Sequence, residues 1–397
     1  MDAYVVEWLS FLGRSLHLIA GIAWIGASFY FIWLDAHLHA PRYGDEAQRL
    51  GIGGEVWALH GGGFYRAQKF AVAPPELPEP LHWFKWEAYS TWLSGMFLLG
   101  LVYYLGAEVY LIDRSVADLS RPVAIAAGLA FLAGGWVVYD LLCRSPLGAR
   151  EPLLAAVMLA LCTLAAYALT HLFSGRGAYI HFGAMLGTIM AGNVLFVIMP
   201  AQREMVLAKS EGRVPDPAHA ARGKQRSVHN TYFTLPVLFT MISNHYATFT
   251  AATHAWLVLV AIALAGVFVR LFFTFRHRGV VRPSFWALAL ALMAAVFVWL
   301  LPRATPAGAG GARFADVRAI VDARCVACHA QHPTFTGFAS APKNVMLDTP
   351  ERILAQAQPL HQQTVVLKVM PIGNLTAMSD AERATIDAWF RAGARAE

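Results

Sequence analysis

The chain has 397 residues, of which 57% are hydrophobic and 14% are charged, and its formal net charge is +6. Most of the charge lies in short gaps between long apolar segments, which excludes a soluble chain and indicates a protein embedded in a lipid bilayer. Because the basic residues belong to these gaps, the positive net charge indicates no nucleic-acid partner.

Apolar segments of about 20 residues are long enough to cross the hydrocarbon of a bilayer. The sequence predicts about eight such segments, at residues 5–34, 83–105, 122–142, 152–171, 178–200, 232–250, 255–275 and 283–301. The sixth contains Pro236, Ser243 and Asn244, so a bent or interfacial helix is the alternative there. We therefore expect an all-α, polytopic membrane helix bundle formed by residues 1–303.

Arginine and lysine are concentrated in alternate gaps between these segments, and the positive-inside rule places those gaps in the cytoplasm. Both termini are then periplasmic, in a multi-pass protein of a bacterial inner membrane. Asp2 and Glu7, followed by a long apolar run, are not typical of a cleavable signal peptide. The first segment is therefore expected to remain in the protein.

A glycine-rich stretch, residues 60–69, follows the first segment on the predicted cytoplasmic side. Its glycines let the backbone approach a ligand closely, and Arg66, Gln68 and Lys69 offer a guanidinium, an amide and an amine to a planar anion. His60 begins the stretch. A basic loop facing lipid headgroups is the alternative interpretation.

Ionisable side chains inside apolar segments are costly and are therefore candidates for function. Glu87, His229 and Asn230 lie toward the cytoplasmic side, where capping of a helix start explains the last two equally well. His17, His181 and His245 come from three segments at similar periplasmic depth. Two of these imidazoles could hold a b-type haem or a metal, and hydrogen-bonded interfacial histidines are the alternative.

The motif Cys325-Val326-Ala327-Cys328-His329 has the spacing of a c-type haem attachment site. On one helical turn the two thiols reach the two vinyl groups of a porphyrin, and the adjacent imidazole meets the iron. We expect Cys325 and Cys328 to hold the haem covalently and His329 to be an axial ligand. A redox-active dithiol that precedes a histidine is the alternative.

Residues 312–397 around this motif are expected to form a small class I cytochrome c domain, tethered by a linker at residues 304–311 that is rich in proline, glycine and alanine. Apolar residues at helical spacing predict helices at 314–324 and 380–391, with Ser379 as an N-cap of the second. In the predicted topology this domain is periplasmic, where oxidising conditions suit covalent attachment.

The sixth ligand of the haem iron is expected between these two helices, since a thioether there raises the reduction potential. Met370 is the preferred candidate because Pro371 stiffens its loop. Met378, beside a helix start, and Met346 are the alternatives.

Several of these stretches together resemble the membrane-bound urate hydroxylases that carry a fused cytochrome c. The resemblance rests on residues 17–29, 60–66, 81–87, 187–194 and 243–246 and on the 370–378 stretch. It implies oxidation of urate to 5-hydroxyisourate, with electrons leaving through the haem to a soluble cytochrome c or a terminal oxidase, and no peroxide formed.

Deprotonation of the urate anion by a histidine or carboxylate would ease its oxidation, and water would then add to the purine. The residues we expect in this site are His60, Glu87 and His229 for proton transfer, and Arg66, Gln68, Lys69 and Asn230 for binding. A cytoplasmic site lies about 30 Å from a periplasmic haem. Either the urate site is therefore deep in the bundle or a second redox centre lies between the two.

Two other classes of function fit part of the sequence. A membrane-anchored cytochrome that accepts electrons from quinol needs a quinone cleft and no purine recognition. A transporter or receptor with a redox-sensing cytochrome needs no electron transfer from its ligand.

Overall fold

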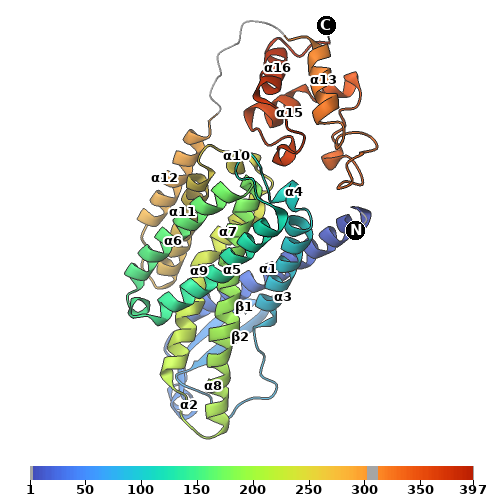
Figure 1. Cartoon of the computed structure of the whole chain (residues 1–397). Coiled ribbons are helices and arrows are strands. Elements are labelled where there is room, and N and C mark those ends of the chain that lie inside the picture. Colours follow the sequence, from blue (N-terminus) through green and yellow to red (C-terminus); the bar gives the residue numbers. More distant parts are fainter. Residues whose placement is uncertain (1–2, 302–311, 397) are drawn as a thin grey trace.

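The computed structural model describes residues 3–301 and 312–396, so the expected linker at 304–311 lies outside the described residues. The helices of the first range are α1 (Ala3–Ala36), α2 (Gly44–Leu50), α3 (Trp86–Leu98), α4 (Ala107–Tyr110), α5 (Arg121–Arg144), α6 (Glu151–Leu172), α7 (Gly175–Asn193), α8 (Met199–Ser210), α9 (Pro217–Ser243), α10 (Ala247–Thr250), α11 (Ala255–His277) and α12 (Ser284–Trp299). Figure 1 shows these helices as an elongated bundle, with a separate C-terminal domain at one end.

Every predicted membrane segment overlaps a helix of this bundle. Among the described residues five helical stretches are long and apolar enough to cross a membrane, namely Tyr4–Ala36, Arg121–Arg144, Glu151–Leu172, Gly175–Ser210 and Ala255–His277. The helix α12 is apolar but shorter. The sixth predicted segment differs most, because α9 begins at Pro217, runs through Pro236 and ends at Ser243. The structure therefore supports several membrane-spanning helices.

The helix α7 lies at the centre of the bundle and packs against α5, α6 and α9. In the most apolar window of Gly175–Ser210, the continuous helical stretch that contains α7, 61% of the residues are buried, against 11% in α1. Outward-facing side chains of α1 such as Ile19 and Ile22 are 67% and 63% exposed. Such an apolar surface is the one that lipid covers in a membrane-spanning helix.

A glycine allows the close contact between α7 and α9. A Cβ atom at Gly183 would overlap the side chain of Thr240, whose hydroxyl donates to the carbonyl of Val237 at 2.8 Å and is therefore fixed. We expect Gly183→Ala to destabilise the protein by about 1–3 kcal/mol, because overpacking forces the two helices apart. The measurement is the unfolding free energy of the purified protein in mixed micelles.

Gly187, one turn further along α7, is the matched control, since nothing lies within 4 Å of a Cβ built there. Gly187→Ala is expected to leave stability unchanged or slightly raised, as alanine is the better helix former. Equal losses from both substitutions would contradict this account of the α7–α9 contact.

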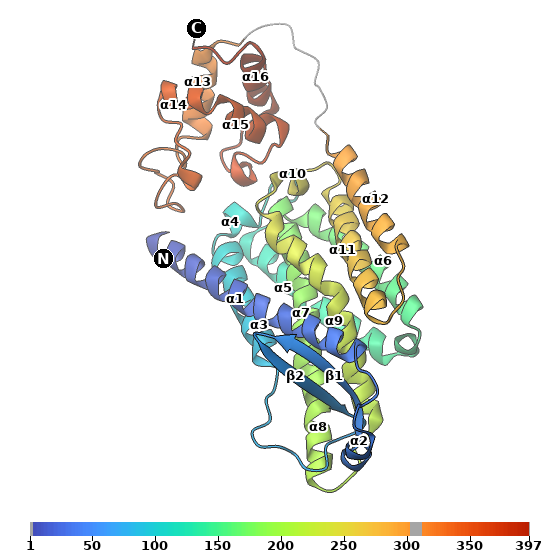
Figure 2. The same cartoon turned by 180° about the vertical axis from the view of Figure 1, so that it is seen from behind.

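The expectation of an all-α chain is wrong for one segment, because β1 (Ile52–His60) and β2 (Gly63–Phe70) form an antiparallel hairpin. Gly61 and Gly62 have φ angles of 56° and 81°, as the two central residues of a tight hairpin turn require. The glycine run therefore builds a turn. Figure 2 shows the hairpin beside α1 and α9, at the end of the bundle far from the C-terminal domain.

The C-terminal domain has its own apolar core. It consists of α13 (Phe314–Arg324), α14 (Pro350–Ala355), α15 (Ala357–His361), the short turn η6 (Ile372–Asn374) and α16 (Asp380–Arg391), with irregular segments between them. The predicted helices at 314–324 and 380–391 are confirmed. Ser379 caps α16 in a capping box with Glu382, as its position suggested. The two helices contact each other, and the Phe314 and Trp389 rings lie 5.9 Å apart.

The C-terminal domain rests on the bundle through η6, which contacts α4. The approach is close, since a Cβ at Gly373 would lie 3.1 Å from the carbonyl oxygen of Ile112. Figure 1 shows the start of α1 at this same end of the bundle. The Cys325–His329 segment and the hairpin therefore lie at opposite ends of the molecule.

Candidate functional site

A polar cleft of about 930 Å³ opens between α1, β2, α9 and α11, and we call it the basic cleft. Its polar lining consists of Asp35, Gln68, Lys69, Lys224, Ser227, Thr231, Thr274 and Arg278. Apolar side chains of α1, among them Phe31 and Ile32, complete the wall. Two residues expected in the urate site, Gln68 and Lys69, therefore lie here.

The charge of the basic cleft is positive. Asp35 is the one carboxylate in its lining, and it pairs with both Lys69 and Lys224, the latter at 2.9 Å. Arg278 has no ion-pair partner within the described ranges. Three cations therefore face one carboxylate. Such a site favours an anionic ligand, and the amide and hydroxyl groups around it provide directional hydrogen bonds.

Arg66 does not line the basic cleft, because two carboxylates hold it within the hairpin region. Its Nε donates to Glu55 at 2.7 Å, and its terminal nitrogens donate to Glu46 at 3.1 Å. The Gln68 amide, in the orientation that satisfies both partners, accepts from Arg66 at 2.7 Å. Arg66 therefore positions Gln68 at the edge of the cleft.

Glu55 gives the hairpin a pH dependence. The backbone N–H of Arg42, at 2.7 Å, with Trp57 and Arg66, lowers the pKa of this buried carboxyl from 4.5 to about 2. Because the pKa falls on folding, the stabilisation is complete above pH 4.5 and is lost as the pH drops toward 2. We expect protection of the 52–70 amides from hydrogen exchange, corrected for intrinsic rates, to fall across this window.

The control for this prediction is Glu55→Gln, which keeps the shape of the side chain and removes its titration. Its hairpin is expected to be less protected at neutral pH and to show little further change on acidification. A wild-type hairpin whose protection stays constant between about pH 4.5 and pH 2 would contradict the role given to Glu55.

A second polar cluster, which we call the His229 network, is buried on the other face of α9. The Nδ1 atom of His229 lies 2.8 Å from the Tyr139 hydroxyl, and its Nε2 lies 3.0 Å from Glu151. Asn193 donates to both the Tyr139 hydroxyl and the Asn230 carbonyl oxygen, at 3.1 and 2.8 Å. The network thus joins α5, α6, α7 and α9 near the hairpin end.

An ion pair extends the His229 network. Arg226 donates to Asp140 at 2.8 Å and to Asn193 at 3.2 Å, and only 4% of its side chain is exposed. Asp140 also pairs with Arg144, whose side chain is 63% exposed. The network fixes one face of α9, and the opposite face then presents Ser227 and Thr231 to the basic cleft.

The other two residues expected to transfer protons lie elsewhere. His60 is exposed at the end of β1, opposite Gly63 across the hairpin turn. Glu87 is half-buried in the first turn of α3, and its Oε2 atom is buried without a hydrogen-bond partner in the described chain. The structure therefore does not bring His60, Glu87 and His229 into one site.

The three periplasmic-half histidines have separate partners. The Nδ1 atom of His17 meets the Thr91 carbonyl and the Ser94 hydroxyl at 3.0 and 3.1 Å. His181 is fully buried, with Nδ1 at 2.8 Å from the Gly177 carbonyl and Nε2 at 3.3 Å from the Tyr104 hydroxyl. A Cβ at Gly128 would lie 2.7 Å from that Nε2.

The space beside the His181 Nε2 is therefore filled by α5 and Tyr104. His245, just after α9, is exposed. Within the ranges that the structure covers, no group of three or more His, Cys, Asp or Glu side chains is placed to hold a metal ion. His17 and His181 are thus hydrogen-bonded histidines in this structure, as in the alternative interpretation of the sequence.

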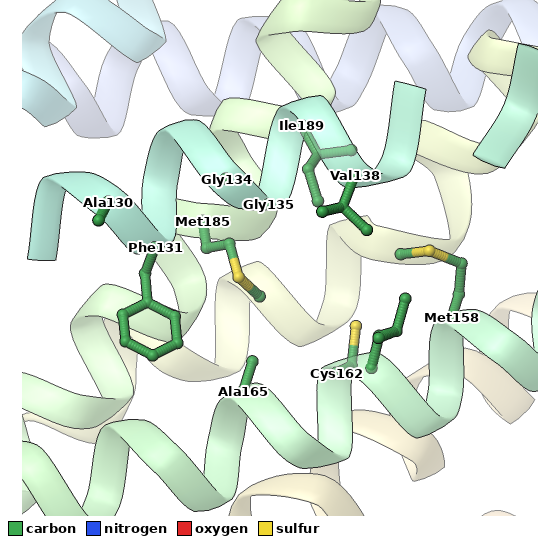
Figure 3. Close-up of a pocket in the computed structure, with 11 residues that line it drawn as sticks. Ala130, Phe131, Gly134, Gly135, Val138, Met158, Cys162, Ala165, Met185 and Ile189 are labelled. Atoms are coloured by element: carbon green, nitrogen blue, oxygen red, sulfur yellow. The ribbon is translucent and has the colours of Figure 1, made fainter. Parts of the chain in front are cut away.

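A smaller pocket of about 310 Å³ lies between α5, α6 and α7 (Figure 3). Figure 3 shows side chains such as Phe131, Met158 and Met185 around it, with Gly134 and Gly135 on the α5 side. Its lining contains no charged or hydrogen-bonding side chain other than the Cys162 thiol. A purine or a quinone head group finds no polar partner there.

The Cys-x-x-Cys-His segment has an arrangement that fits a covalent haem c. Nδ1 of His329 lies 2.9 Å from the Val345 carbonyl, so a proton on Nδ1 is donated to that oxygen and Nε2 remains for an iron. Burial raises the pKa of the Cys325 thiol to about 12 and also raises that of Cys328.

Two of the three sulfur candidates for a sixth ligand, Met370 and Met378, lie in the segment before α16. Met378 is 3% exposed and belongs to the apolar core that contains Cys325, and Asn374 holds its backbone through two hydrogen bonds. Met370 is half-buried, and its carbonyl accepts from Arg383 at 2.8 Å. Met378 therefore packs in the same core as Cys325, whereas the Met370 backbone is held by Arg383.

Sequence reasoning missed most of the residues that build these clusters. Among them are Tyr139, Asp140, Glu151, Asn193, Lys224, Arg226 and Arg278. The signal that would have found Asp140 and Arg226 is charge at the ends of apolar segments, since an ionised side chain near hydrocarbon needs a partner of opposite charge. The sequence does not indicate which of the many arginines and lysines between the apolar segments has its side chain inside the bundle.

Among known protein families, one family model matches the part of the chain that forms the helical bundle. The model of the urate oxidase N-terminal family matches residues 3–301, which is three quarters of the chain and includes the basic cleft and the His229 network. Comparison with curated proteins and with solved structures gives no match. The C-terminal domain lies outside the matched range. The match agrees with the resemblance seen in the sequence, and the chain belongs to the urate oxidase N-terminal family.

Proposed function

We propose that this protein is a membrane-bound oxidoreductase that hydroxylates urate to 5-hydroxyisourate and passes the electrons through a covalent haem c to the respiratory chain. The observation that carries the proposal is the basic cleft within the family-matched bundle. It has the volume, positive charge and directional hydrogen-bonding groups that a planar purine anion requires.

In this proposal urate binds in the basic cleft rather than at the glycine turn. Lys224 and Arg278 join the expected residues Gln68 and Lys69 as binding groups. Asp35 holds the two lysine ammonium groups in place and leaves their remaining N–H donors for the ligand. Ser227, Thr231 and Thr274 supply hydroxyls that can donate to or accept from the ring edge in the same cleft.

The His229 network has a positioning role in this proposal. His229 and Asn230 point away from the basic cleft, toward α5, α6 and α7, while the next residues of α9 face it. His229→Gln is therefore expected to lower the affinity for urate more than it lowers the rate at which bound urate is oxidised. His60 and Glu87 lie outside the cleft lining, and the proposal gives them no step.

The reaction balances with water as the oxygen source. Urate loses two electrons and two protons, and the oxygen of one water molecule becomes the new hydroxyl group of 5-hydroxyisourate. When bound at Cys325, Cys328 and His329, with Met370 as the proposed sixth ligand, a haem c would accept the electrons one at a time and pass them to a soluble cytochrome c or a terminal oxidase. No peroxide is formed.

The C-terminal domain lies at the end of the bundle opposite the basic cleft, so in this proposal the electrons cross the bundle to reach it. It contacts α4 through η6, and the Tyr110 side chain at the end of α4 lies within electrostatic reach of Cys328. We place this domain in the periplasm of a bacterial inner membrane, because the basic gaps lie at the opposite, hairpin end. The b-type haem considered from the sequence is not part of the proposal.

Isotopic labelling tests the chemistry. Purified protein supplied with urate, oxidised cytochrome c and ¹⁸O-labelled water is expected to place one labelled oxygen in 5-hydroxyisourate and to form no hydrogen peroxide. Label that enters the product from dissolved oxygen instead, with peroxide formed, would overturn the proposal. The apolar pocket of Figure 3 gives a quinol no polar partner, so the carrier alternative has no comparable support.

A further inference from the structure

Arg270 is a buried cation with no carboxylate partner among the described residues. It lies in α11, within a candidate membrane span, and is 6% exposed. Its Nε atom is buried without a hydrogen bond, and no hydrogen bond or ion pair forms from its guanidinium in the described part of the chain. An ionised group with five donors is costly to bury unless something satisfies it.

Aromatic groups surround Arg270 instead of carboxylates. Its Cζ atom lies 3.8 Å from the ring centroid of Phe29 on α1, and its charge interacts with Tyr232 on α9. The attraction between a cation and an aromatic face partly compensates for the loss of hydration. The N–H donors at the edge of the guanidinium still have no acceptor. The carboxylate of Asp35 is already paired with Lys69 and Lys224.

The position of Arg270 relates it to the basic cleft. Thr274 and Arg278, four and eight residues further along α11, both line the cleft, so Arg270 is on the same face of the helix. Arg270 precedes Thr274 by four residues, which is about 6 Å along the axis of α11. On α1, Phe29 likewise lies about one helical turn before Ile32, which lines the cleft. Arg270 therefore lies beyond the inner end of the cleft, toward the middle of the bundle.

We propose that Arg270 is the anchor for the anionic edge of the substrate at the inner end of the basic cleft. This inference rests on the proposed function and specifies the substrate as a planar purine anion. A guanidinium fork can donate two parallel hydrogen bonds to neighbouring acceptors on such a ring. The Gln68 amide and the cleft hydroxyls then face the remaining polar edge. A phospholipid phosphate shares the anionic chemistry but not the planar set of ring donors and acceptors.

The experiment measures binding without turnover. The full-length haem protein is purified in detergent, reduced with dithionite so that it accepts no electrons, and titrated with urate by calorimetry. Arg270→Gln is expected to weaken urate binding by about 10- to 100-fold, because charge-assisted hydrogen bonds are lost. Arg270→Lys keeps the positive charge but not the two parallel donors of the guanidinium, so its urate affinity is expected to lie between those of wild type and Arg270→Gln. Hypoxanthine is uncharged near neutral pH, so either variant should bind it with little loss of affinity.

Arg276→Gln is the matched control, since Arg276 is an exposed residue of the same helix. It should bind urate within about twofold of wild type, as exposed charges contribute little. Unchanged urate binding by Arg270→Gln, with a normal haem spectrum, would overturn the anchor role alone. Wild-type protein that does not bind urate would overturn both this inference and the proposed function.

Nanodiscs containing phosphatidylglycerol, and inorganic phosphate added in detergent, distinguish the two sources of an anion. The proposal expects neither to compete with urate strongly. Strong competition by both, together with phospholipid that copurifies with wild type and not with Arg270→Gln, would assign Arg270 to a lipid headgroup and overturn the inference.

Discussion

Replacing both Cys325 and Cys328 with serine is expected to give a protein without covalent haem that still binds urate. The thiols are the only groups in the motif that can form thioether bonds, so haem staining after denaturation should fall to background. The basic cleft lies at the other end of the bundle and shares no residue with the C-terminal domain. Urate affinity should therefore stay within about twofold of wild type, and urate oxidation should stop.

The control is the double variant Cys143→Ser and Cys162→Ser, which changes the other two of the four cysteines. These thiols lie in α5 and α6 and take no part in the haem site. That variant should retain covalent haem. Covalent haem that survives in the Cys325 and Cys328 variant would contradict the assignment of the motif.

The second large effect is expected from Asp140→Asn. This change keeps the shape of the side chain and leaves the buried guanidinium of Arg226 without its counter-charge. Removal of one member of a buried ion pair costs about 3–5 kcal/mol, because the remaining charge stays desolvated. The expected result is a loss of about 3 kcal/mol in unfolding free energy, measured in mixed micelles.

The same carboxylate supplies its own control. Arg144 pairs with the other oxygen of Asp140 at 2.7 Å, but its side chain is 63% exposed. Arg144→Ala should therefore cost less than about 1 kcal/mol. If both variants lose the same stability, the burial of Arg226 is not what makes the His229 network strong, and the positioning role of that network for α9 loses its basis.

The regular elements follow from local sequence. Apolar runs placed the membrane helices, and helical spacing with a Ser379 cap placed α13 and α16, because these signals act over neighbouring residues. The hairpin was missed because the glycine run was interpreted as a ligand loop. Its two turn glycines, between segments containing Trp57 and Tyr65, are a hairpin signal once read together.

The candidate site was only partly predictable, since the basic cleft combines α1, β2, α9 and α11. Gln68 and Lys69 were named from the sequence because they follow the glycine run, and both line the cleft. Arg66 belongs to the same strand but is held by Glu55, a contact across the hairpin that sequence spacing does not reveal. Arg270 lies inside the predicted membrane segment 255–275, where an ionised side chain is a candidate for function, but it was not among the residues named from the sequence.

The proposal also explains why the cleft and the C-terminal domain need each other. In the proposal the basic cleft holds the oxidisable anion, and the haem c expected at Cys325, Cys328 and His329 accepts its electrons. The contact between η6 and α4 fixes one end of the route between them. Arg270 brings the proposed ligand deeper into the bundle, which shortens that route.

The most direct test of the central claim is an anaerobic titration of the oxidised haem protein with urate, followed by haem absorbance and by analysis of the product. The account predicts reduction by urate alone, with two haems reduced for each urate converted to 5-hydroxyisourate, and no reduction by hypoxanthine. A haem that stays oxidised with urate but is reduced by menaquinol would contradict the account and identify a respiratory electron carrier.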